Sequence, residues 1–284
     1  MDTVIARKVH RTIEAYHGMI YLVPEAQAEY ATFGLSSEEY FKGYFASRSA
    51  AMGRVPGEVV VATFYNFHPD LVMRAVPSCW NLASPDEWQR ARRRAADAAL
   101  RRLLGDAVDS PSMTEALGLA RVAVDACQPF GRPLFAGHTS LEWPDQPHMA
   151  LWHAISLLRE YRGDGHISTL VAQELSPIEA LVLHEHSGMV PPGVLQSTRA
   201  WSDDEWSAGC ERLAGRGWME GTELNESGRQ LREDIERHTD DLAMAPWQAL
   251  GTEGCQRLRD LVRPFSKAIA ESGDLGPLTS TRTR

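Results

Sequence analysis

Hydrophobic residues recur every three or four positions along most of the chain, a spacing typical of amphipathic helices. Residues 4–32 show it first, with Val9, Ile13 and Tyr16 on one face, and Pro24 there either kinks the helix or starts a second one. The same spacing, bounded by Pro, Gly or Ser, predicts helices over residues 38–52, 57–67, 69–80, 88–104, 112–126 and 149–161. Residues 129–147 are rich in Pro and Gly and predict an irregular stretch.

Alternating strand patterns are nearly absent, so the sequence predicts an all-α protein. A C-terminal module opens at Ser176-Pro177-Ile178-Glu179, where Ser caps a helix, Pro stands first and an acid follows. Residues 217–224 leave room only for a short two-stranded wing. We expect a helical domain over 1–172, a winged-helix-like domain over 173–250, and a final helix with a disordered polar tail over 251–284.

Three segments characterise the C-terminal module: LSPIEALVLHEHSG, WSDDEWSAGCERLAGRGWMEG and LNESGRQLREDIERHTDDLA, the last similar to the familiar LT-x-x-G-R-x-L exit from a wing. On these segments the module resembles a MarR-like winged helix. The whole chain also resembles an actinobacterial family of proteins that contain a helix-turn-helix. The segments that carry this likeness are YFASRSAAMG, VVVATFYNFHPDLVMRAVPSCW and LWHAISLLREYRGDGHISTLV. The resemblance implies the fold but no particular activity.

In MarR-type regulators the third helix of the module enters the major groove. Here residues 201–220 contain five acids (Asp203, Asp204, Glu205, Glu211 and Glu220) and two bases (Arg212 and Arg216). Acids at a helix start are also ordinary capping chemistry, but they repel phosphate. The sequence therefore disfavours DNA as a partner. The basic helix 88–102 could restore DNA binding, but such a run is more often a solvated face or pairs with acidic helices of the same chain.

Composition places the protein among ordinary globular chains: 284 residues, 43% hydrophobic, with a formal net charge of −9. No signal peptide and no apolar run of membrane-spanning length is visible, so we expect a cytoplasmic protein. The four cysteines are far apart, and the sequence lacks an H-E-x-x-H motif, a P-loop and a G-x-G-x-x-G loop. We therefore expect neither a metal nor a cofactor.

One cluster that could carry chemistry is Thr63–Asp70, where aromatic residues, an amide and an imidazole crowd a helix end. Pro69 biases His68 away from helical geometry and would turn its ring off the helix axis. Together with Tyr65 and Asn66 it would suit a planar organic ligand. The alternative is structural, with the aromatic residues in the core and His68 as a cap.

The second cluster is a polar run in the helical region 149–166. Gly163 and Gly165 flank Asp164 and would permit a turn. Asp164 could then orient His166 as a general base, with the arginines holding an anionic group. The alternative is a pair of helix caps with solvated ion pairs. The residues predicted to form this site are Trp152, His153, Arg159, Arg162, Asp164 and His166.

These observations favour a small-molecule-binding protein with a pocket between the helical domain and the winged helix. It would bind an aromatic or carboxylated metabolite of specialised metabolism, or act on it as a cofactor-independent acid–base enzyme with His166, Asp164 and His68 as catalytic groups. The alternative is a MarR-like regulator that senses a ligand and binds DNA as a homodimer. A third possibility is an interaction protein with an exposed apolar patch around Trp201, Trp206 and Trp218.

Overall fold

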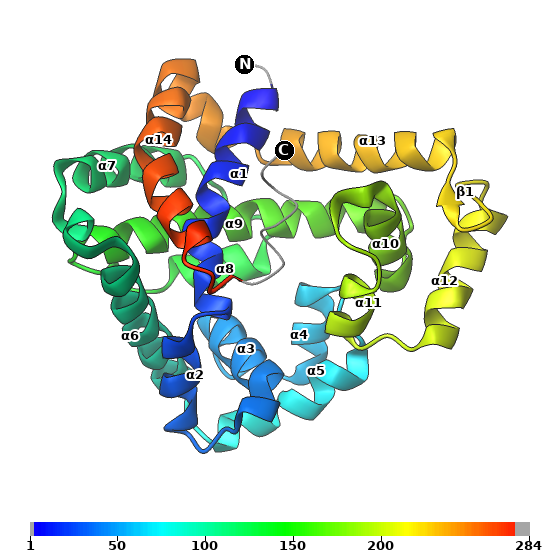
Figure 1. Ribbon diagram of the computed structural model, residues 1–284, viewed down its shortest axis with the longest axis horizontal. Helices are drawn as coiled ribbons and strands as arrows, with labels where there is room; N and C mark the ends of the chain where they lie inside the picture. The colour runs from blue at the N-terminus through cyan, green and yellow to red at the C-terminus, as the bar shows by residue number, and fades with distance from the viewer. Residues whose placement is uncertain (1–2, 276–284) are drawn as a thin grey trace.

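The computed structural model describes residues 3–275 and is helical throughout, except for one two-stranded sheet (Figure 1). The N-terminal helices are α1 (Thr3–Gly18), α2 (Pro24–Ala31), α3 (Tyr40–Ser49), α4 (Gly57–Phe64), α5 (Pro69–Ala75), α6 (Pro85–Leu104), α7 (Pro111–Asp125), α8 (Pro133–Thr139) and α9 (Pro147–Ala172). The C-terminal elements are α10 (Pro177–His184), α11 (Val194–Arg199), α12 (Asp203–Gly215), β1 (Met219–Glu220), β2 (Glu223–Leu224), α13 (Glu226–Leu242) and α14 (Ala245–Glu271). The all-α prediction with a short wing is confirmed.

Serine caps begin several of these helices, as the sequence predicts. Ser84 of α6 and Ser176 of α10 each accept a hydrogen bond from the amide of the glutamate three residues later, and that glutamate returns the bond to the serine amide. Such reciprocal caps satisfy backbone donors that the first helical turn leaves open. The local sequence therefore fixes where these helices start.

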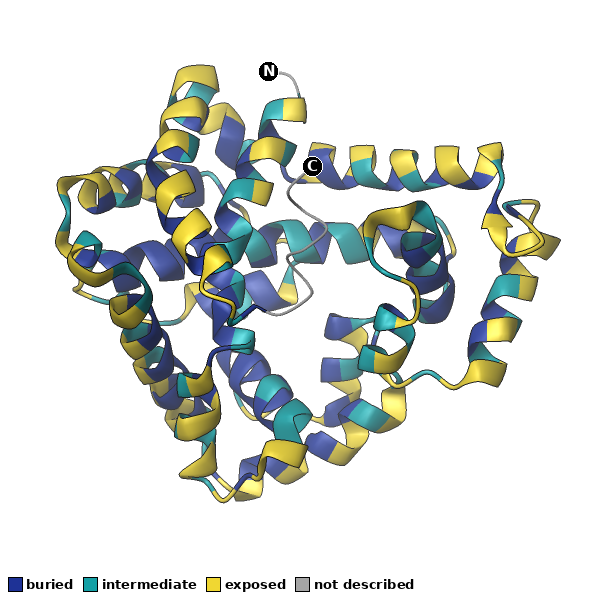
Figure 2. Cartoon of the chain, viewed as in Figure 1, coloured by how far each residue is buried: buried dark blue, intermediate teal, exposed yellow. Residues whose placement is uncertain are grey.

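Helix α9 lies at the centre of the molecule and contacts α1, α7, α8 and α13 (Figure 1). It is buried along most of its length (Figure 2). Helix α14 returns from the C-terminal side and packs on α1 and α7. The largest hydrophobic core thus joins the two ends of the chain around α9.

The break predicted at residues 163–165 is wrong, because helix α9 continues through these residues without interruption for a total of 26 residues. Gly165 serves close packing instead of a turn. A Cβ added there would lie 2.8 Å from Nη1 of Arg132 and 3.4 Å from Cβ of Leu242. Close packing against Arg132 and Leu242 thus outweighs the poor helix propensity of glycine at this position.

Three other predicted boundaries were also wrong. The stretch 129–147 contains helix α8. The helix expected over 57–67 ends at Phe64, because Tyr65 adopts a positive φ of 61°. The helix expected over 69–80 ends at Ala75, shortly before Pro77, and a short 3₁₀ turn at 78–81 follows it.

The C-terminal module consists of α10, α11, α12, the wing and α13. Strands β1 and β2 are antiparallel, with Met219 opposite Leu224. Gly228, in the first turn of α13, lies so close to the Trp218 carbonyl that an added Cβ would be 2.1 Å from its oxygen. The glycine of the LNESGR segment therefore lets α13 pack against the wing.

The proposed domain limits stay predictions. Helix α14 begins at Ala245, before the expected limit at 250, and bends at Gly251, where φ is 67°. Of the polar tail expected to be disordered, residues 276–284 lie outside the described part of the chain. Among residues 3–275, no helix combines the length and apolarity needed to cross a bilayer.

Candidate functional site

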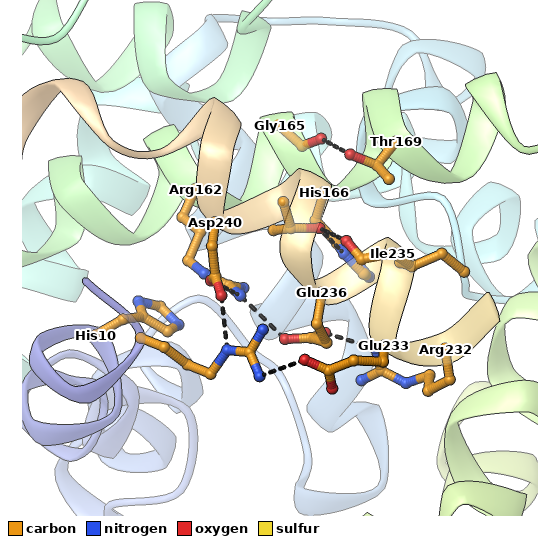
Figure 3. Close-up of polar contacts among 12 residues, drawn as sticks. His10, Arg162, Gly165, His166, Thr169, Arg232, Glu233, Ile235, Glu236 and Asp240 are labelled. Carbon is orange, nitrogen blue, oxygen red and sulfur yellow. Dashed lines mark hydrogen bonds and ion pairs between the residues drawn. The ribbon is translucent and has the colours of Figure 1, made fainter. Parts of the chain in front are cut away.

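The predicted base His166 lies in a contact between α9 and α13 (Figure 3). Its Nδ1 is 2.9 Å from Oγ1 of Thr239, whose hydroxyl donates to the Ile235 carbonyl. Thr239 is therefore the acceptor, and Nδ1 of His166 carries the proton. Burial lowers the pKa of His166 to about 3. A neutral imidazole held in this way aligns two helices.

Arg162 belongs to the same contact. Its Nη2 donates to Asp240 at 2.9 Å and to Glu236 at 3.1 Å, and Asp240 also accepts from Nε of Arg7 at 2.6 Å (Figure 3). The ion pairs therefore join α1, α9 and α13. The carboxylates already present occupy the anion site expected of Arg162.

Asp164 does not orient His166, which corrects the expected acid–base pair. Residues two apart on a continuous helix point in different directions. The Asp164 carboxylate instead accepts from the backbone amide of Phe135 at 2.9 Å, near the start of α8. Burial raises the pKa of Asp164 to about 6. Its observed role is to anchor α8 on α9.

The other predicted residues of α9 are buried or partly buried. Trp152 is buried, and its indole nitrogen is 3.4 Å from the His17 carbonyl. His153 is buried edge-on against Trp143, and burial lowers its pKa to about 3. Arg159 is partly buried and donates to Glu160 at 2.8 Å. None of the three is available as an open binding surface.

Tyr65, Asn66 and His68 come together, but as a junction with the C-terminal module. The Tyr65 hydroxyl donates to the Leu175 carbonyl, and the Asn66 carbonyl accepts from the indole nitrogen of Trp201 at 3.0 Å. Nδ1 of His68 accepts from the Asp70 amide as a cap of α5. The structural alternative considered for this cluster therefore describes these contacts.

His68 makes the most contacts at this junction. Its backbone amide donates to the Arg199 carbonyl at 2.9 Å, and its ring lies edge-on to Trp201. Its Nε2 is 3.0 Å from Oε1 of Glu205, in the first turn of α12. The turn between α11 and α12 is thereby docked on α5.

A cavity of about 340 Å³ lies elsewhere, between the turn at 19–21, α2 and α3. None of the predicted site residues lines it. Its wall includes the side chains of Tyr21, Tyr30, Tyr40, Tyr44 and Ser47. Gly43 on α3 lets Tyr30 approach, since an added Cβ would be 2.7 Å from Cδ2 of that ring. The tyrosines combine apolar faces with polar tips, a lining suited to organic ligands.

Tyr21 belongs to an oriented chain of hydrogen bonds behind this wall. The Ser156 hydroxyl donates to the Trp152 carbonyl at 2.8 Å, so its oxygen accepts from Nδ1 of His17 at 2.9 Å. Nε2 of His17 must then accept from the Tyr21 hydroxyl, also at 2.9 Å. Burial holds the pKa of His17 well below its usual range. The neutral imidazole thus accepts a hydrogen bond from the phenol and orients it.

Two buried arginines lie behind the same wall. Nη1 of Arg48 donates to the Tyr44 hydroxyl at 2.9 Å, and Nη2 of Arg92 donates to the Tyr21 hydroxyl at 3.2 Å. Arg48 is paired with the buried carboxylate of Glu160, at 2.8 Å. Burial opposes the charge of Glu160, but the neighbouring arginines hold its pKa well below the usual range.

Sequence reasoning missed these residues, although weak signals were present. Tyr40, Tyr44 and Arg48 recur at intervals of four on one predicted helix, which places them on one face. Arg92 is hidden in the basic run of α6, where composition alone cannot separate one buried arginine from exposed neighbours. Arg94 and Arg102 of that run pair with Glu29 and Glu25 of α2, as the alternative of pairing within the chain predicts.

The basic residues of α12 and the turn after it are engaged within the chain. Arg216 donates to the carbonyls of Gln173 and Glu174 and covers the Trp218 ring, and Arg212 lies 4.0 Å from Glu179. The exposed outer side of α12 retains its acids (Figure 2). Phosphate would thus meet negative charge.

The expected patch of tryptophans is not exposed. Trp206 is buried in the core of the module, and Trp201 is only partly accessible beside His68. Trp218 is partly covered by Arg216. The interaction-protein hypothesis loses the surface on which it rested.

Comparison with known proteins identifies the chain at the level of a family. Residues 6–276 match the family model described as a helix-turn-helix family. No curated protein and no solved structure matches the chain. The match covers the cavity as well as the C-terminal module.

Proposed function

The chain belongs to this helix-turn-helix family, and we propose that it is a small-molecule-binding protein whose ligand occupies the tyrosine-lined cavity. One observation carries the proposal: a cavity of about 340 Å³ walled by four tyrosines, two of which accept hydrogen bonds from buried arginines. Ligand pockets typically have volumes of about 300–1,000 Å³, with apolar walls and a few fixed polar groups.

This cavity is not at the place where the sequence predicted the ligand pocket. A pocket between the helical domain and the module required Tyr65, Asn66 and His68 to be available, yet their observed contacts hold the junction together. The ligand class stays as predicted, an aromatic or carboxylated metabolite. If the ligand is turned over, Tyr21 with His17 behind it takes the acid–base role first given to His166.

A thermal-shift screen tests the proposal. The purified protein is exposed to aromatic amino acids, keto acids and aromatic acids, because a ligand that binds only the folded state raises its stability by mass action. Gly43→Ala forces Tyr30 to move and should abolish the shift. Gly118→Ala, on the exposed side of α7 with no atom within 4 Å of the added Cβ, is the matched control and should retain it.

Two outcomes would count against the cavity. A screen without any stabilising compound would remove the support for ligand binding. Stabilisation that persists unchanged in Gly43→Ala would place the ligand at another site. Loss of the shift in Gly43→Ala together with its retention in Gly118→Ala would support the proposal.

DNA binding as a MarR-like dimeric regulator is the second candidate, and the family match is the observation that favours it. The acids of α12 and the engaged bases Arg212 and Arg216 oppose it. A gel shift at low salt on the DNA upstream of the gene decides the matter. A salt-sensitive complex, weakened in the double variant Arg212→Ala/Arg216→Ala, would favour the regulator, and no complex would exclude it.

A further inference from the structure

The buried charges behind the cavity are not balanced one to one. Glu160 accepts from both Arg48, at 2.8 Å, and Arg159, also at 2.8 Å. Arg92 is fully buried, yet within residues 3–275 it forms no ion pair with a carboxylate. The charge of Glu160 acts on Arg92, but Arg48 and Arg159 already share that carboxylate. A buried cation without an ion-pair partner of its own is costly, so its position calls for an explanation.

Arg92 lies directly behind the cavity wall. Its guanidinium carbon is 5.0 Å from the centre of the Tyr21 ring and 5.3 Å from that of Trp152, and its charge also acts on Tyr30. Its Nη1 is buried and has no hydrogen-bond partner among the described residues. Two of the side chains on which it acts, Tyr21 and Tyr30, line the cavity.

Besides Nη1 of Arg92, the Tyr44 hydroxyl in the cavity wall is available as a donor. The Tyr44 oxygen accepts from Arg48, and within residues 3–275 its proton has no acceptor. A phenol that accepts from a guanidinium becomes a stronger donor, because hydrogen bonds in series polarise one another. By contrast, the Tyr40 hydroxyl is already used, donating to the Tyr21 carbonyl at 2.7 Å.

Neither of two further acids, Glu39 and Glu14, neutralises the charge of Arg92. Glu39 lines the cavity, but its carboxylate is held by Lys42 at 2.7 Å and by the amide of Ser36 at 3.2 Å. Glu14 acts on Arg159 from α1, and its carboxylate is 3.5 Å from His10. Neither forms an ion pair with Arg92.

We propose that the ligand is a small planar organic acid, whose carboxylate accepts from the Tyr44 hydroxyl and supplies the counter-charge for Arg92 while its apolar body packs among the tyrosines. This inference rests on the proposed function and narrows the ligand class. It explains why a cation without a carboxylate partner is kept next to a cavity with polar tips. A neutral ligand would leave that charge uncompensated.

Matched acid and amide pairs test the charge separately from the cavity. Calorimetric titration compares phenylacetate with phenylacetamide, 4-hydroxybenzoate with 4-hydroxybenzamide, and indole-3-acetate with indole-3-acetamide. At least one acid should bind about tenfold or more tightly than its amide, since charge-assisted hydrogen bonds are roughly twice as strong as neutral ones. The amide keeps the shape but is neutral, with an NH2 donor in place of one carboxylate oxygen.

Arg92→Met is the decisive variant, because removing this guanidinium leaves no carboxylate without a partner. Acid affinity should fall about tenfold or more while amide affinity is unchanged. Arg101→Met, on the exposed side of the same helix, is the control and should bind as the wild type does. Should Arg92→Met fail to fold by circular dichroism, Tyr44→Phe keeps the ring and should weaken the acid alone.

The outcomes separate the two proposals. Equal binding of acid and amide, or an acid affinity unaffected by both variants, would overturn the inference and leave the cavity as a site for neutral ligands. Failure of every acid and every amide to bind would overturn the inference together with the cavity proposal. Selective loss of acid binding in Arg92→Met supports both.

Discussion

Nε2 of His68 lies 3.0 Å from Oε1 of Glu205, which links the cap of α5 to the first turn of α12. The same glutamate completes the capping box of α12 with Ser202. One carboxylate thus stabilises the start of the helix that would read DNA and docks it on the N-terminal portion. This contact therefore joins α5 to the first turn of α12.

A double-mutant cycle measures that contact. His68→Asn retains an acceptor for the Asp70 amide, and Glu205→Gln retains the geometry of the cap. The partners are only partly buried, so we expect a favourable coupling below about 1 kcal/mol in urea denaturation. Glu87→Gln, in the equivalent cap of α6, is the control and should be additive with His68→Asn. Equal coupling energies in the His68/Glu205 cycle and the His68/Glu87 cycle would rule out a specific link between His68 and Glu205.

Asp164 should make stability fall as pH rises. Burial raises the pKa of its carboxyl to about 6 in the folded state, so between about pH 4 and 6 the folded protein binds more protons than the unfolded chain. The contribution of Asp164 to the free energy of unfolding therefore decreases across this window, by on the order of 2–3 kcal/mol. Asp164→Asn should remove the decrease, measured by urea denaturation from pH 4 to 8. An unchanged pH profile would contradict a buried, protonated Asp164.

Buried histidines should act in the opposite sense. Burial lowers the pKa of His138 to about 4 and that of His153 to about 3, so below about pH 6.5 the unfolded chain takes up protons that the folded protein does not. The contribution of these histidines to stability is then full above pH 6.5 and falls as the solution is acidified. His153→Leu in the Asp164→Asn background should reduce the slope by up to about 1.4 kcal/mol per pH unit. At pH 8 the His153→Leu substitution should give no gain in stability of this kind. The same slope with and without His153→Leu would contradict the assignment of His153 as a buried neutral imidazole.

Glu160 should be the most sensitive carboxylate near the cavity. Glu160→Gln leaves Arg48 and Arg159 without their shared counter-ion, and breaking a buried ion pair in this way costs about 3–5 kcal/mol. Urea denaturation at pH 7 measures the loss. Glu29→Gln, which removes the partner of the exposed Arg94, is the control and should cost under about 1 kcal/mol. Similar losses in the two variants would mean that the buried pair contributes little.

Two glycines on helices should respond to alanine in opposite directions. Gly118→Ala adds a methyl group in open space and should stabilise the protein by about 0.5–1 kcal/mol. Gly165→Ala places its methyl group 2.8 Å from Arg132, whose guanidinium lies over the Tyr161 ring, and should destabilise by about 1–3 kcal/mol. Thermal melting of both variants gives the comparison. Stabilisation by Gly165→Ala would show that Arg132 moves aside freely.

The sequence by itself determined the helices and their starts. Periodicity of apolar residues and the Ser-x-x-Glu caps are local signals, since each depends on residues three or four positions apart. They gave the all-α class, the wing and the acidic character of α12. For the basic run of α6, one of the alternatives, pairing with acidic residues of the same chain, agrees with the ion pairs of Arg94 and Arg102.

Only the tertiary structure decided which polar residues share a site. The dyad expected of Asp164 and His166 failed because α9 is buried on several sides, so the helix continues through two glycines and turns the two side chains toward different neighbours. Arg92 and Tyr21 are 71 residues apart in sequence and meet behind the cavity. Burial and long-range proximity depend on how whole helices pack, and no local pattern records that packing.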